Sequence, residues 1–297
     1  MEVQWFFVAL SPGGVVDRDR IGAMAGAFFT MQLGWDAPGG APDRLRPGVS
    51  VRAWLRPGSL VGTILERTSE GVAIGVPHGA SPSDWGLALC LASAFGRDEM
   101  QPVLCPDGVE QPPEAVLALA EPQRLWKQWV EQSKQAFQFV ASEKRTLTLS
   151  GIRDLYLGAQ VTKTCIDSKD PARTLLRVLN RSAHLIGLER FEEVLPTLNE
   201  EGGDRWWSAR FASEFPCVLR NPEWLELEGA PPSHFLPMPA LGRALGKPLE
   251  QLDELTFAIP PVPRAEWSAF LGRAQAFLVR FPRSRKRQKP AWVPDLG

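Results

Sequence analysis

The chain has 297 residues, of which 44% are hydrophobic, and its formal net charge is −1. This length and composition predict a globular chain that buries a sizeable core in about two domains. The charge provides no overall field that would attract nucleic acid or an anionic membrane surface. No apolar run approaches the roughly 18 to 20 residues that a membrane-spanning helix requires, so we expect no membrane partner.

The cysteines and the first residues of the chain bear on the cellular compartment in which the protein is expected. Cys90, Cys105, Cys165 and Cys217 stand far apart, and none belongs to a C-x-x-C pair. We interpret them as ordinary buried thiols, and the alternative is a metal or redox role. Residues 1–5 lack the basic start and the cleavage site of a signal peptide, so disulfides formed in an oxidising compartment are not expected. The prediction is a cytoplasmic protein.

The first third of the chain contains six patterned segments in the order strand, helix, strand, strand, helix, strand. This order is the split βαβ, or ferredoxin-like, arrangement, and we expect both helices on one face of a single sheet. Residues 35–58 are rich in proline and glycine and interrupt the pattern, with one short strand expected at 49–55. The six segments are the strand 3–10, a helix from Asp17 that Gly34 ends, the strands 61–67 and 72–76, the helix 82–96 and the strand 102–105.

The second of these helices has the clearest start signal in the chain. Ser81 is the expected N-cap, Pro82 suits the first helical position, and Asp84 completes a Ser-x-x-Asp capping box. The apolar residues that follow go almost all the way round the helix, which predicts burial on more than one side. Gly96 is expected to end the helix.

The rest of the chain mixes helices with strands, which predicts a second α+β unit. Residues 191–203 are acidic and loop-like. The predicted domains are a ferredoxin-like α+β domain at 1–110, connecting amphipathic helices at 111–142, a second α+β domain at 143–282 and a basic C-terminal tail at 283–297. We expect helices at 112–120, 122–141, 171–186, 241–245, 249–252 and 263–280, and strands at 145–149, 160–166, 204–211, 217–228 and 255–259.

No motif assigns a catalytic, cofactor-binding or metal-binding residue. His78 lies in a loop before the capped helix, where it could contact an anion, whereas His184 and His234 are interpreted as structural or solvated. Neither H-E-x-x-H nor an EF-hand loop is present. The pair Gly13-Gly14 could cradle a phosphate, but the G-x-x-x-x-G-K-S/T and G-x-G-x-x-G patterns are missing, and acidic residues follow. A plain turn is therefore favoured there.

The segment Arg280–Lys289 contains six basic residues, and the remainder of the chain without it has a formal charge of −7. Such a run could contact nucleic acid through phosphates. We favour a solvated tail, or a strap that pairs with the acidic segment 189–201, because no aromatic residues for base stacking are interleaved with the charges. We expect no nucleic-acid partner.

Eleven tryptophans against a single tyrosine is the most unusual feature of the composition. Most lie on apolar helical stripes, but Trp206 and Trp207 are adjacent on a predicted strand and must point to opposite faces. Either both faces are buried, or one ring is exposed. We predict exposure, and a protein-binding surface that includes Arg205 or Arg210, because tryptophan and arginine are favoured interface anchors.

Two functional hypotheses remain. The first is a non-enzymatic protein-binding factor of a bacterial cell, for example an immunity (antitoxin-like) protein or an accessory protein. The segment Ser83–Leu89 with Pro106-Asp107-Gly108 resembles uncharacterised bacterial families, over less than a tenth of the chain, and this resemblance implies no function. The second hypothesis is an enzyme whose site is assembled from dispersed residues, with His78, Asp84 and Arg205 as conceivable members.

Overall fold

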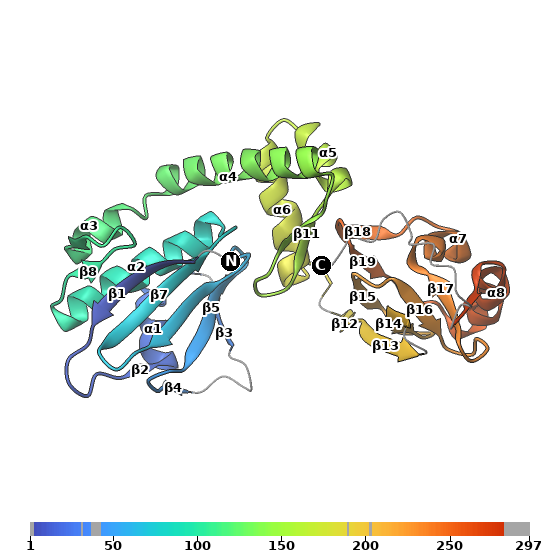
Figure 1. Cartoon of the computed structure of the whole chain (residues 1–297), viewed down its shortest axis with the longest axis horizontal. Coiled ribbons are helices and arrows are strands. Elements are labelled where there is room, and N and C mark those ends of the chain that lie inside the picture. The colour runs from blue at the N-terminus through green and yellow to red at the C-terminus, as the bar shows by residue number, and fades with distance from the viewer. Residues whose placement is uncertain (1–2, 31, 37–42, 189, 202–203, 282–297) are drawn as a thin grey trace. The chain divides into compact units, whose positions relative to one another are not determined.

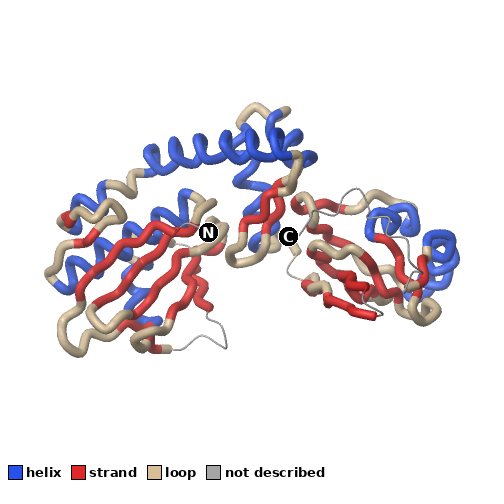
Figure 2. Tube along the Cα trace, viewed as in Figure 1, coloured by secondary structure: helices blue, strands red, loops and turns tan. Residues whose placement is uncertain are grey.

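The computed structural model describes residues 3–30, 32–36, 43–188, 190–201 and 204–281. The chain packs as two compact units: unit 1 comprises Met1–Leu155 and Thr162–His184, and unit 2 comprises Tyr156–Val161 and Leu185–Gly297. Each unit mixes helices with sheets (Figure 1, Figure 2), so the chain has the α+β character that the sequence predicts. Among the described residues, no helix is long and apolar enough to cross a membrane.

Unit 1 is built on a seven-stranded sheet in which all neighbouring strands are antiparallel. Its first strand lies in the interior of the sheet, beside the central strand: Phe6 pairs with Ile74 and Val8 pairs with Val72, and all four side chains are buried. In sheet order the strands are β3 (Gln32–Asp36), β5 (Ser50–Arg56), β6 (Thr63–Arg67), β7 (Gly71–Pro77), β1 (Val3–Ala9), β8 (Val103–Leu104) and β9 (Glu110–Gln111).

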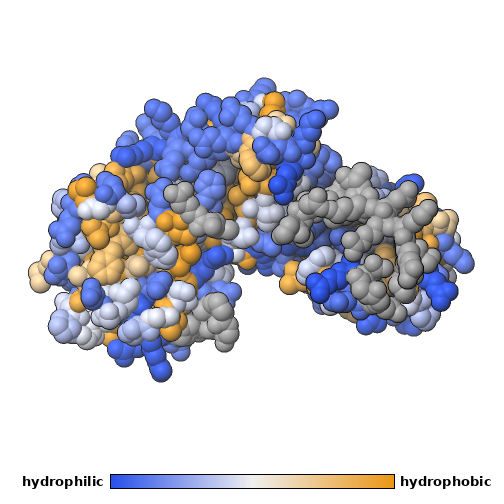
Figure 3. Space-filling view, viewed as in Figure 1, coloured by the Kyte–Doolittle hydropathy of each residue, from blue (hydrophilic) through white to orange (hydrophobic). Residues whose placement is uncertain are grey.

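Two helices lie on one face of this sheet. Helix α2 (Pro82–Glu99) contacts β1 and β5 to β7, and α1 (Arg18–Gly26) packs against α2. Figure 1 shows both helices behind the sheet. Figure 3 shows hydrophobic residues among hydrophilic ones on the face that these helices leave open. Strand β2 (Val16–Asp17), directly before α1 in the chain, pairs with β4 (Arg44–Leu45) in a separate two-stranded antiparallel sheet.

The start of α2 confirms the predicted capping box. Ser81 Oγ accepts a hydrogen bond from Asp84 N at 3.2 Å, and the Asp84 carboxylate accepts one from Ser81 N at 2.8 Å. The same carboxylate also accepts backbone N–H groups of Leu60, Val61 and Gly62 at 2.9 to 3.3 Å. Asp84 therefore fixes the loop between β5 and β6 as well as the helix start, a role that the local pattern does not display.

The prediction that Gly96 ends this helix is wrong. The helix continues to Glu99, and Met100, with φ of 53°, is the C-cap. A Cβ at Gly96 would lie 2.8 Å from Pro113 and 3.0 Å from the backbone oxygen of Gln101. Glycine is needed there because it lets α3 (Pro113–Ala118) pack closely against α2.

The prediction that Gly34 ends the first helix is also wrong. Asp17 caps the helix as expected, accepting Arg20 N at 2.8 Å, but the helix ends at Gly26. Gly34 lies in β3, where the indole of Trp54 from the neighbouring strand occupies the space of a side chain. Of the irregular excursion at 35–58, residues 37–42 lie outside the described residues, and the expected short strand is β5.

Helix α6 (Pro171–His184) belongs to unit 1 and is held at both ends. The indole Nε1 of Trp129 donates to Ala172 O at 2.9 Å, and Gly58 N donates to Asn180 Oδ1 at 3.0 Å. The predicted strand at 160–166 is wrong, because the segment lies in helix α5 (Ala159–Ile166). The N–H groups of Gln160 and Val161, which belong to unit 2, donate to the carboxylate of Glu254 in the same unit. The elements after α3 are α4 (Pro122–Glu143), β10 (Leu147–Leu149), β11 (Leu155–Leu157), α5 (Ala159–Ile166) and α6 (Pro171–His184).

Unit 2 contains two sheets. The four-stranded sheet has the order β12 (Glu192–Val194), β15 (Cys217–Arg220), β19 (Thr256–Ile259) and β18 (Glu250–Asp253). The five-stranded sheet has the order β13 (Thr197–Glu201), β14 (Asp204–Phe211), β16 (Trp224–Leu227), β17 (His234–Pro237) and β20 (Val279–Arg280).

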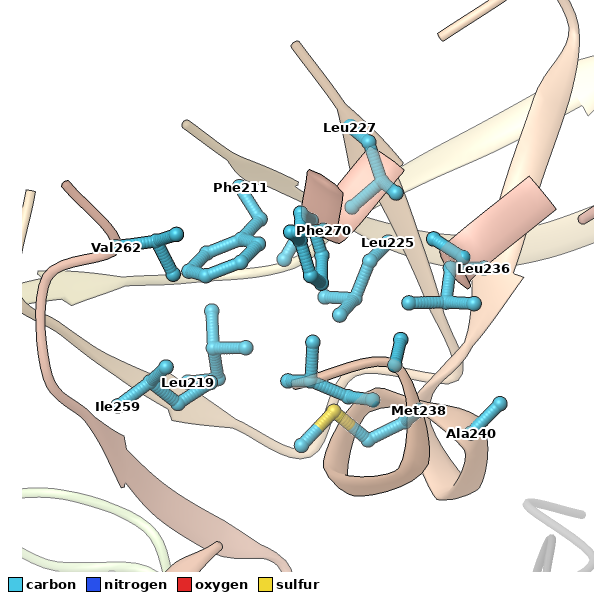
Figure 4. Packing of buried hydrophobic residues seen from close by; sticks show 14 of the residues in the cluster. Phe211, Leu219, Leu225, Leu227, Leu236, Met238, Ala240, Ile259, Val262 and Phe270 are labelled. Carbon is cyan, nitrogen blue, oxygen red and sulfur yellow. The ribbon is translucent and has the colours of Figure 1, made fainter. Parts of the chain in front are cut away.

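Both sheets contribute to one core with α7 (Leu241–Leu245) and α8 (Arg264–Ala274). Figure 4 shows how side chains from these elements converge on a common apolar interior. Three rings, those of Phe211, Trp267 and Phe270, lie within 5.8 Å of one another by their centroids. Besides Phe211 and Phe270, Figure 4 labels these members of the cluster: Leu219, Leu225, Leu227, Leu236, Met238, Ala240, Ile259 and Val262.

Several expected elements of unit 2 differ in the structure. The expected helix at 249–252 is strand β18, because the segment pairs with β19 along the edge of the sheet. The expected strand at 217–228 is two strands, β15 and β16, and Asn221, with φ of 48°, lies between them. The final helix ends at Ala274 rather than at 280, and β20 pairs with β17. The segment 191–203, interpreted as a loop, contains β12 and β13.

Candidate protein-binding surface

The four predicted surface residues lie on β14, which forms a hairpin with the edge strand β13. The antiparallel register places Leu198 opposite Trp207, Glu200 opposite Arg205, and Asn199 opposite Trp206. Because side chains alternate along a strand, these pairs divide between the two faces of the hairpin. The faces must therefore be considered separately.

Trp206 belongs to a closed aromatic cluster on one face. Its ring stacks on Phe281 with centroids 4.8 Å apart and meets Phe235 edge-on at 5.9 Å, and Trp224 completes the cluster. Trp206 is 6% exposed, and its buried indole N–H has no hydrogen-bond partner among the described residues. This tryptophan is a packing residue and presents no surface to a partner.

Trp207 lies on the other face and is 37% exposed. Ala209 and Phe211 follow it on the same face of β14 and belong to the core shown in Figure 4. Leu198, the cross-strand neighbour of Trp207, is 45% exposed. On this face of the hairpin, Ala209 and Phe211 are therefore buried in the core, whereas the neighbouring apolar pair Trp207 and Leu198 is accessible.

Charged groups border this pair. Arg205 Nε lies 3.0 Å from Glu200 Oε2, and both side chains are exposed on the Trp207 face. The Glu223 carboxylate accepts the backbone N–H of Trp207 at 3.1 Å and so fixes the strand at this point. Arg210 is exposed, but it lies on the face of Trp206. The structure therefore brings Trp207 together with Arg205, and separates both from Trp206 and Arg210.

Sequence reasoning missed Leu198, the second apolar member of this surface. The acidic composition of its segment hid strand β13, and without that strand no neighbour could be assigned to Trp207. The surface itself is suited to binding rather than to acid–base chemistry, since an exposed indole, an isobutyl group and an ion pair offer apolar area with a polar border.

Asp84, His78 and Arg205, the suggested members of a dispersed enzyme site, lie in three different environments. Asp84 is fully buried, and its oxygens accept five donors from Ser81 and from residues 60–62. His78 is exposed in a loop of unit 1, and Arg205 belongs to unit 2 and pairs with Glu200. A carboxylate so fully engaged holds a loop in place and is not open to a substrate.

The glycine turn near the N-terminus binds a carboxylate of the chain itself. Ser11 N donates to Glu99 Oε2 at 2.8 Å, and the Arg20 guanidinium lies 2.8 Å from Glu99 Oε1. Burial would raise the pKa of Glu99, but the hydrogen bonds from Ser11 and Arg20 hold it below its ordinary value. This contact supports the plain-turn interpretation of Gly13-Gly14.

The other histidines are structural in their contacts. His184 is buried, and its Nε2 donates to Ser59 O at 2.7 Å. Burial lowers the pKa of His184, and the nearby charges of Arg56 and Arg153 lower it further. His234 Nδ1 lies 2.9 Å from Pro232 O. Of the basic segment Arg280–Lys289, Arg280 lies in β20, and residues 282–289 lie outside the described residues.

All four cysteines are buried free thiols. Burial raises the pKa of Cys90 and Cys165 to about 11 and that of Cys217 to about 12, and it also raises the pKa of Cys105. The reactive thiolate is therefore disfavoured at neutral pH. In the part of the chain that the structure describes, no three side chains of histidine, cysteine, aspartate or glutamate are placed to hold a metal ion.

Comparison of the chain with models of protein families, with curated proteins and with solved structures finds no match in any of the three.

Proposed function

We propose that this chain is a non-enzymatic protein-binding factor, of the kind represented by immunity (antitoxin-like) or accessory proteins of bacterial cells. One observation carries the proposal: Trp207 and Leu198 form an accessible apolar pair at the edge of a sheet, next to the Arg205–Glu200 ion pair. Interfaces concentrate binding energy in such tryptophan and arginine anchors, bordered by polar groups. The partner is another protein that covers this pair.

The test uses the intact chain with a photo-crosslinking amino acid at position 207. A matched chain with the same group at position 139 is the control, because Phe139 is also exposed but lies on α4 of unit 1. Cross-linking to a partner from position 207 alone is expected. Trp207→Ala should then weaken binding of the purified partner about thirtyfold, equivalent to about 2 kcal/mol, whereas Phe139→Ala should change it less than about twofold. Equal binding by both variants would refute the proposal.

We also propose that the sheet of unit 1 is an extended ferredoxin-like unit. The order β6-β7-β1-β8, with α1 and α2 on one face, supports this classification, and β3 and β5 are then insertions between α1 and β6. An experimental structure in which β8 does not pair with β1 would exclude it. A cytoplasmic location is part of the same proposal, since the four buried thiols are unpaired. Secretion of the native chain in an oxidised, disulfide-bonded form would contradict this location.

A further inference from the structure

Strand β13 is the outer strand of the five-stranded sheet of unit 2. Its register with β14 runs without a shift over five residue pairs, and in the part of the chain that the structure describes no strand pairs with its other side. Figure 1 shows β13 beside β14 at the border of unit 2. The backbone groups on the outer side of β13 are therefore open to pairing with one more strand.

The contacts of β14 show which backbone groups of β13 face outward. Trp207 N donates to the Glu223 carboxylate at 3.1 Å, and Phe211 O accepts the backbone N–H of the residue after β16 at 3.0 Å. The backbone groups of Trp207 and Phe211 thus point toward β16 and away from β13. In an antiparallel pair of strands, the residue opposite such a residue also points its backbone groups outward. Leu198 lies opposite Trp207, and the alternation adds Glu200, so the N–H and C=O groups of both face the open edge.

Edge strands are usually protected by shortness, bulges, proline or lysine. The other edge strands of the two sheets of unit 2 have such protection: β12 has three residues, β20 has two, and β18 has a shift in its register with β19. β13 has five residues and contains neither proline nor lysine. In unit 1, β3 is as long, but none of the exposed large apolar residues found among the described ones lies on it or on β5. β13 thus combines a regular open edge with the accessible pair Trp207 and Leu198.

We propose that β13 binds an extended segment of a partner protein as an additional antiparallel strand of this sheet. The inference rests on the proposed protein-binding function and specifies how the partner is bound. The backbone of Leu198 and Glu200 forms the hydrogen bonds, and alternate apolar side chains of the partner cover Leu198 and Trp207. The carboxylate of Glu200 takes no part, because it is paired with Arg205.

A second copy of the chain is a less suitable occupant of this edge. The segment 192–201 contains four glutamates and no lysine or arginine. Four glutamates less the two arginines that pair with Glu193 and Glu200 leave a formal charge of −2, so two copies of β13 side by side would bring like charges together. The same charges favour a segment with basic residues. The expected partner segment therefore has apolar residues at alternate positions and basic residues at its ends.

The first test measures fluorescence anisotropy of a labelled peptide of about nine residues, in which valine and threonine alternate between terminal lysines, on addition of the full chain. In antiparallel pairing, the residue opposite Leu198 points its side chain to the Trp207 face and its N–H to β13. Valine is preferred at this position, so N-methylation of the valines should weaken binding at least about tenfold. N-methylation of the threonines should change binding less than about threefold, because their N–H groups face solvent.

Two substitutions at one position separate the backbone from the side chain. Glu200→Pro removes an outward N–H and obstructs the added strand, whereas Glu200→Ala removes only the ion pair with Arg205. The proline variant should bind the unmethylated peptide at least about tenfold more weakly than the alanine variant. The two variants should have similar stability, because the N–H of Glu200 does not bond to β14, and Asn199→Pro should be less stable than both. If Glu200→Pro fails to fold, the two methylated peptides still decide the proposal with the parent chain.

Three results would overturn the added strand. The first is equal sensitivity of binding to the two methylated peptides, and the second is equal peptide binding by Glu200→Pro and Glu200→Ala. The third is a dimer of the chain in sedimentation velocity that Glu200→Pro abolishes, which would make the edge a self-association site.

The partner cross-linked at position 207 distinguishes this failure from failure of the proposed function. A partner that Trp207→Ala weakens, but that binds Glu200→Pro and Glu200→Ala equally, would refute the added strand and leave the protein-binding surface intact. Unchanged partner affinity in Trp207→Ala would refute the proposed function itself.

Discussion

Two tryptophans with the same exposed fraction, Trp5 in unit 1 and Trp207 in unit 2, have different surroundings. Each is 37% exposed. The Trp5 ring lies across Gly75 of the neighbouring strand, where a Cβ would come within 2.8 Å of it. Trp207 lies opposite Leu198, which is itself 45% exposed. Exposure alone therefore does not distinguish a packed ring from an available one, whereas the residue beneath the ring does.

The same difference extends to polar groups. In unit 1, the buried Asp84 finds five donors within its own unit, and the sheet glycine Gly75 is covered by an aromatic ring. In the hairpin of unit 2, the apolar pair Trp207 and Leu198 finds no such cover from its own strands. At these positions, unit 1 provides the hydrogen-bond donors and the aromatic cover from its own residues. The hairpin of unit 2 leaves the apolar pair Trp207 and Leu198 accessible to a partner.

The largest effect is expected from Asp84→Ala. Removal of the carboxylate leaves the N–H groups of Leu60, Val61 and Gly62 buried without their acceptor, and the free energy of unfolding should fall by about 3 to 5 kcal/mol. Denaturant unfolding monitored by circular dichroism measures the change. Ser81→Ala, which removes the cap but keeps the carboxylate, should cost about 1 kcal/mol. A loss for Asp84→Ala no larger than that for Ser81→Ala would show that the loop does not depend on Asp84.

A second test concerns the hairpin. Trp207→Ala should reduce partner affinity by about 2 kcal/mol while changing the free energy of unfolding by less than about 1 kcal/mol, the usual range of a cross-strand pair. Calorimetric titration and denaturant unfolding of the same protein give both numbers. Leu198→Ala should show a smaller change in affinity of the same sign. A large loss of stability with unchanged affinity would assign Trp207 to the core and remove the contrast with Trp5.

Trp5→Ala should have the opposite profile. The ring covers Gly75, so its removal should lower the free energy of unfolding by about 1 to 2 kcal/mol and leave partner affinity unchanged. Gly75→Ala offers a second measurement, because the added Cβ must displace the ring and so raise its accessibility to a fluorescence quencher. If Trp5→Ala weakens the partner complex as much as Trp207→Ala does, both rings are interface residues.

The start of α2 could be predicted because all its determinants lie within four residues: Ser81, Pro82 and Asp84 act on neighbouring backbone groups. Gly96 and Gly34 were misinterpreted for the opposite reason. Their neighbours in space, Pro113 and Trp54, are distant in the chain, and a glycine required by packing has the same local pattern as a glycine that ends a helix.

The candidate surface shows the same limit. Strand β14 was predicted with its observed bounds, because its alternation is strong, and the adjacent tryptophans had to divide between its faces. Strand β13 was missed because edge strands tolerate charged residues, and Glu200 and its neighbours resemble a loop. The pairing of Leu198 with Trp207 requires both strands, so only the register of the folded hairpin reveals it.

The smallest expected effect is a pH dependence that belongs to unit 1. Burial lowers the pKa of His184, so the folded chain binds this proton less readily than the unfolded chain does. Stability is therefore complete above the unfolded pKa of about 6.5 and declines as pH falls toward the lower folded pKa. The variant His184→Gln should flatten the stability profile between about pH 5 and pH 7, a window that lies above the titration of carboxylates. Denaturant unfolding across this range measures the slope, and His78→Gln is the matched control because His78 is exposed. An unchanged slope for His184→Gln would mean that the ring is already accessible to protons in the folded chain, and that unit 1 is less closed at Ser59 than its contacts indicate.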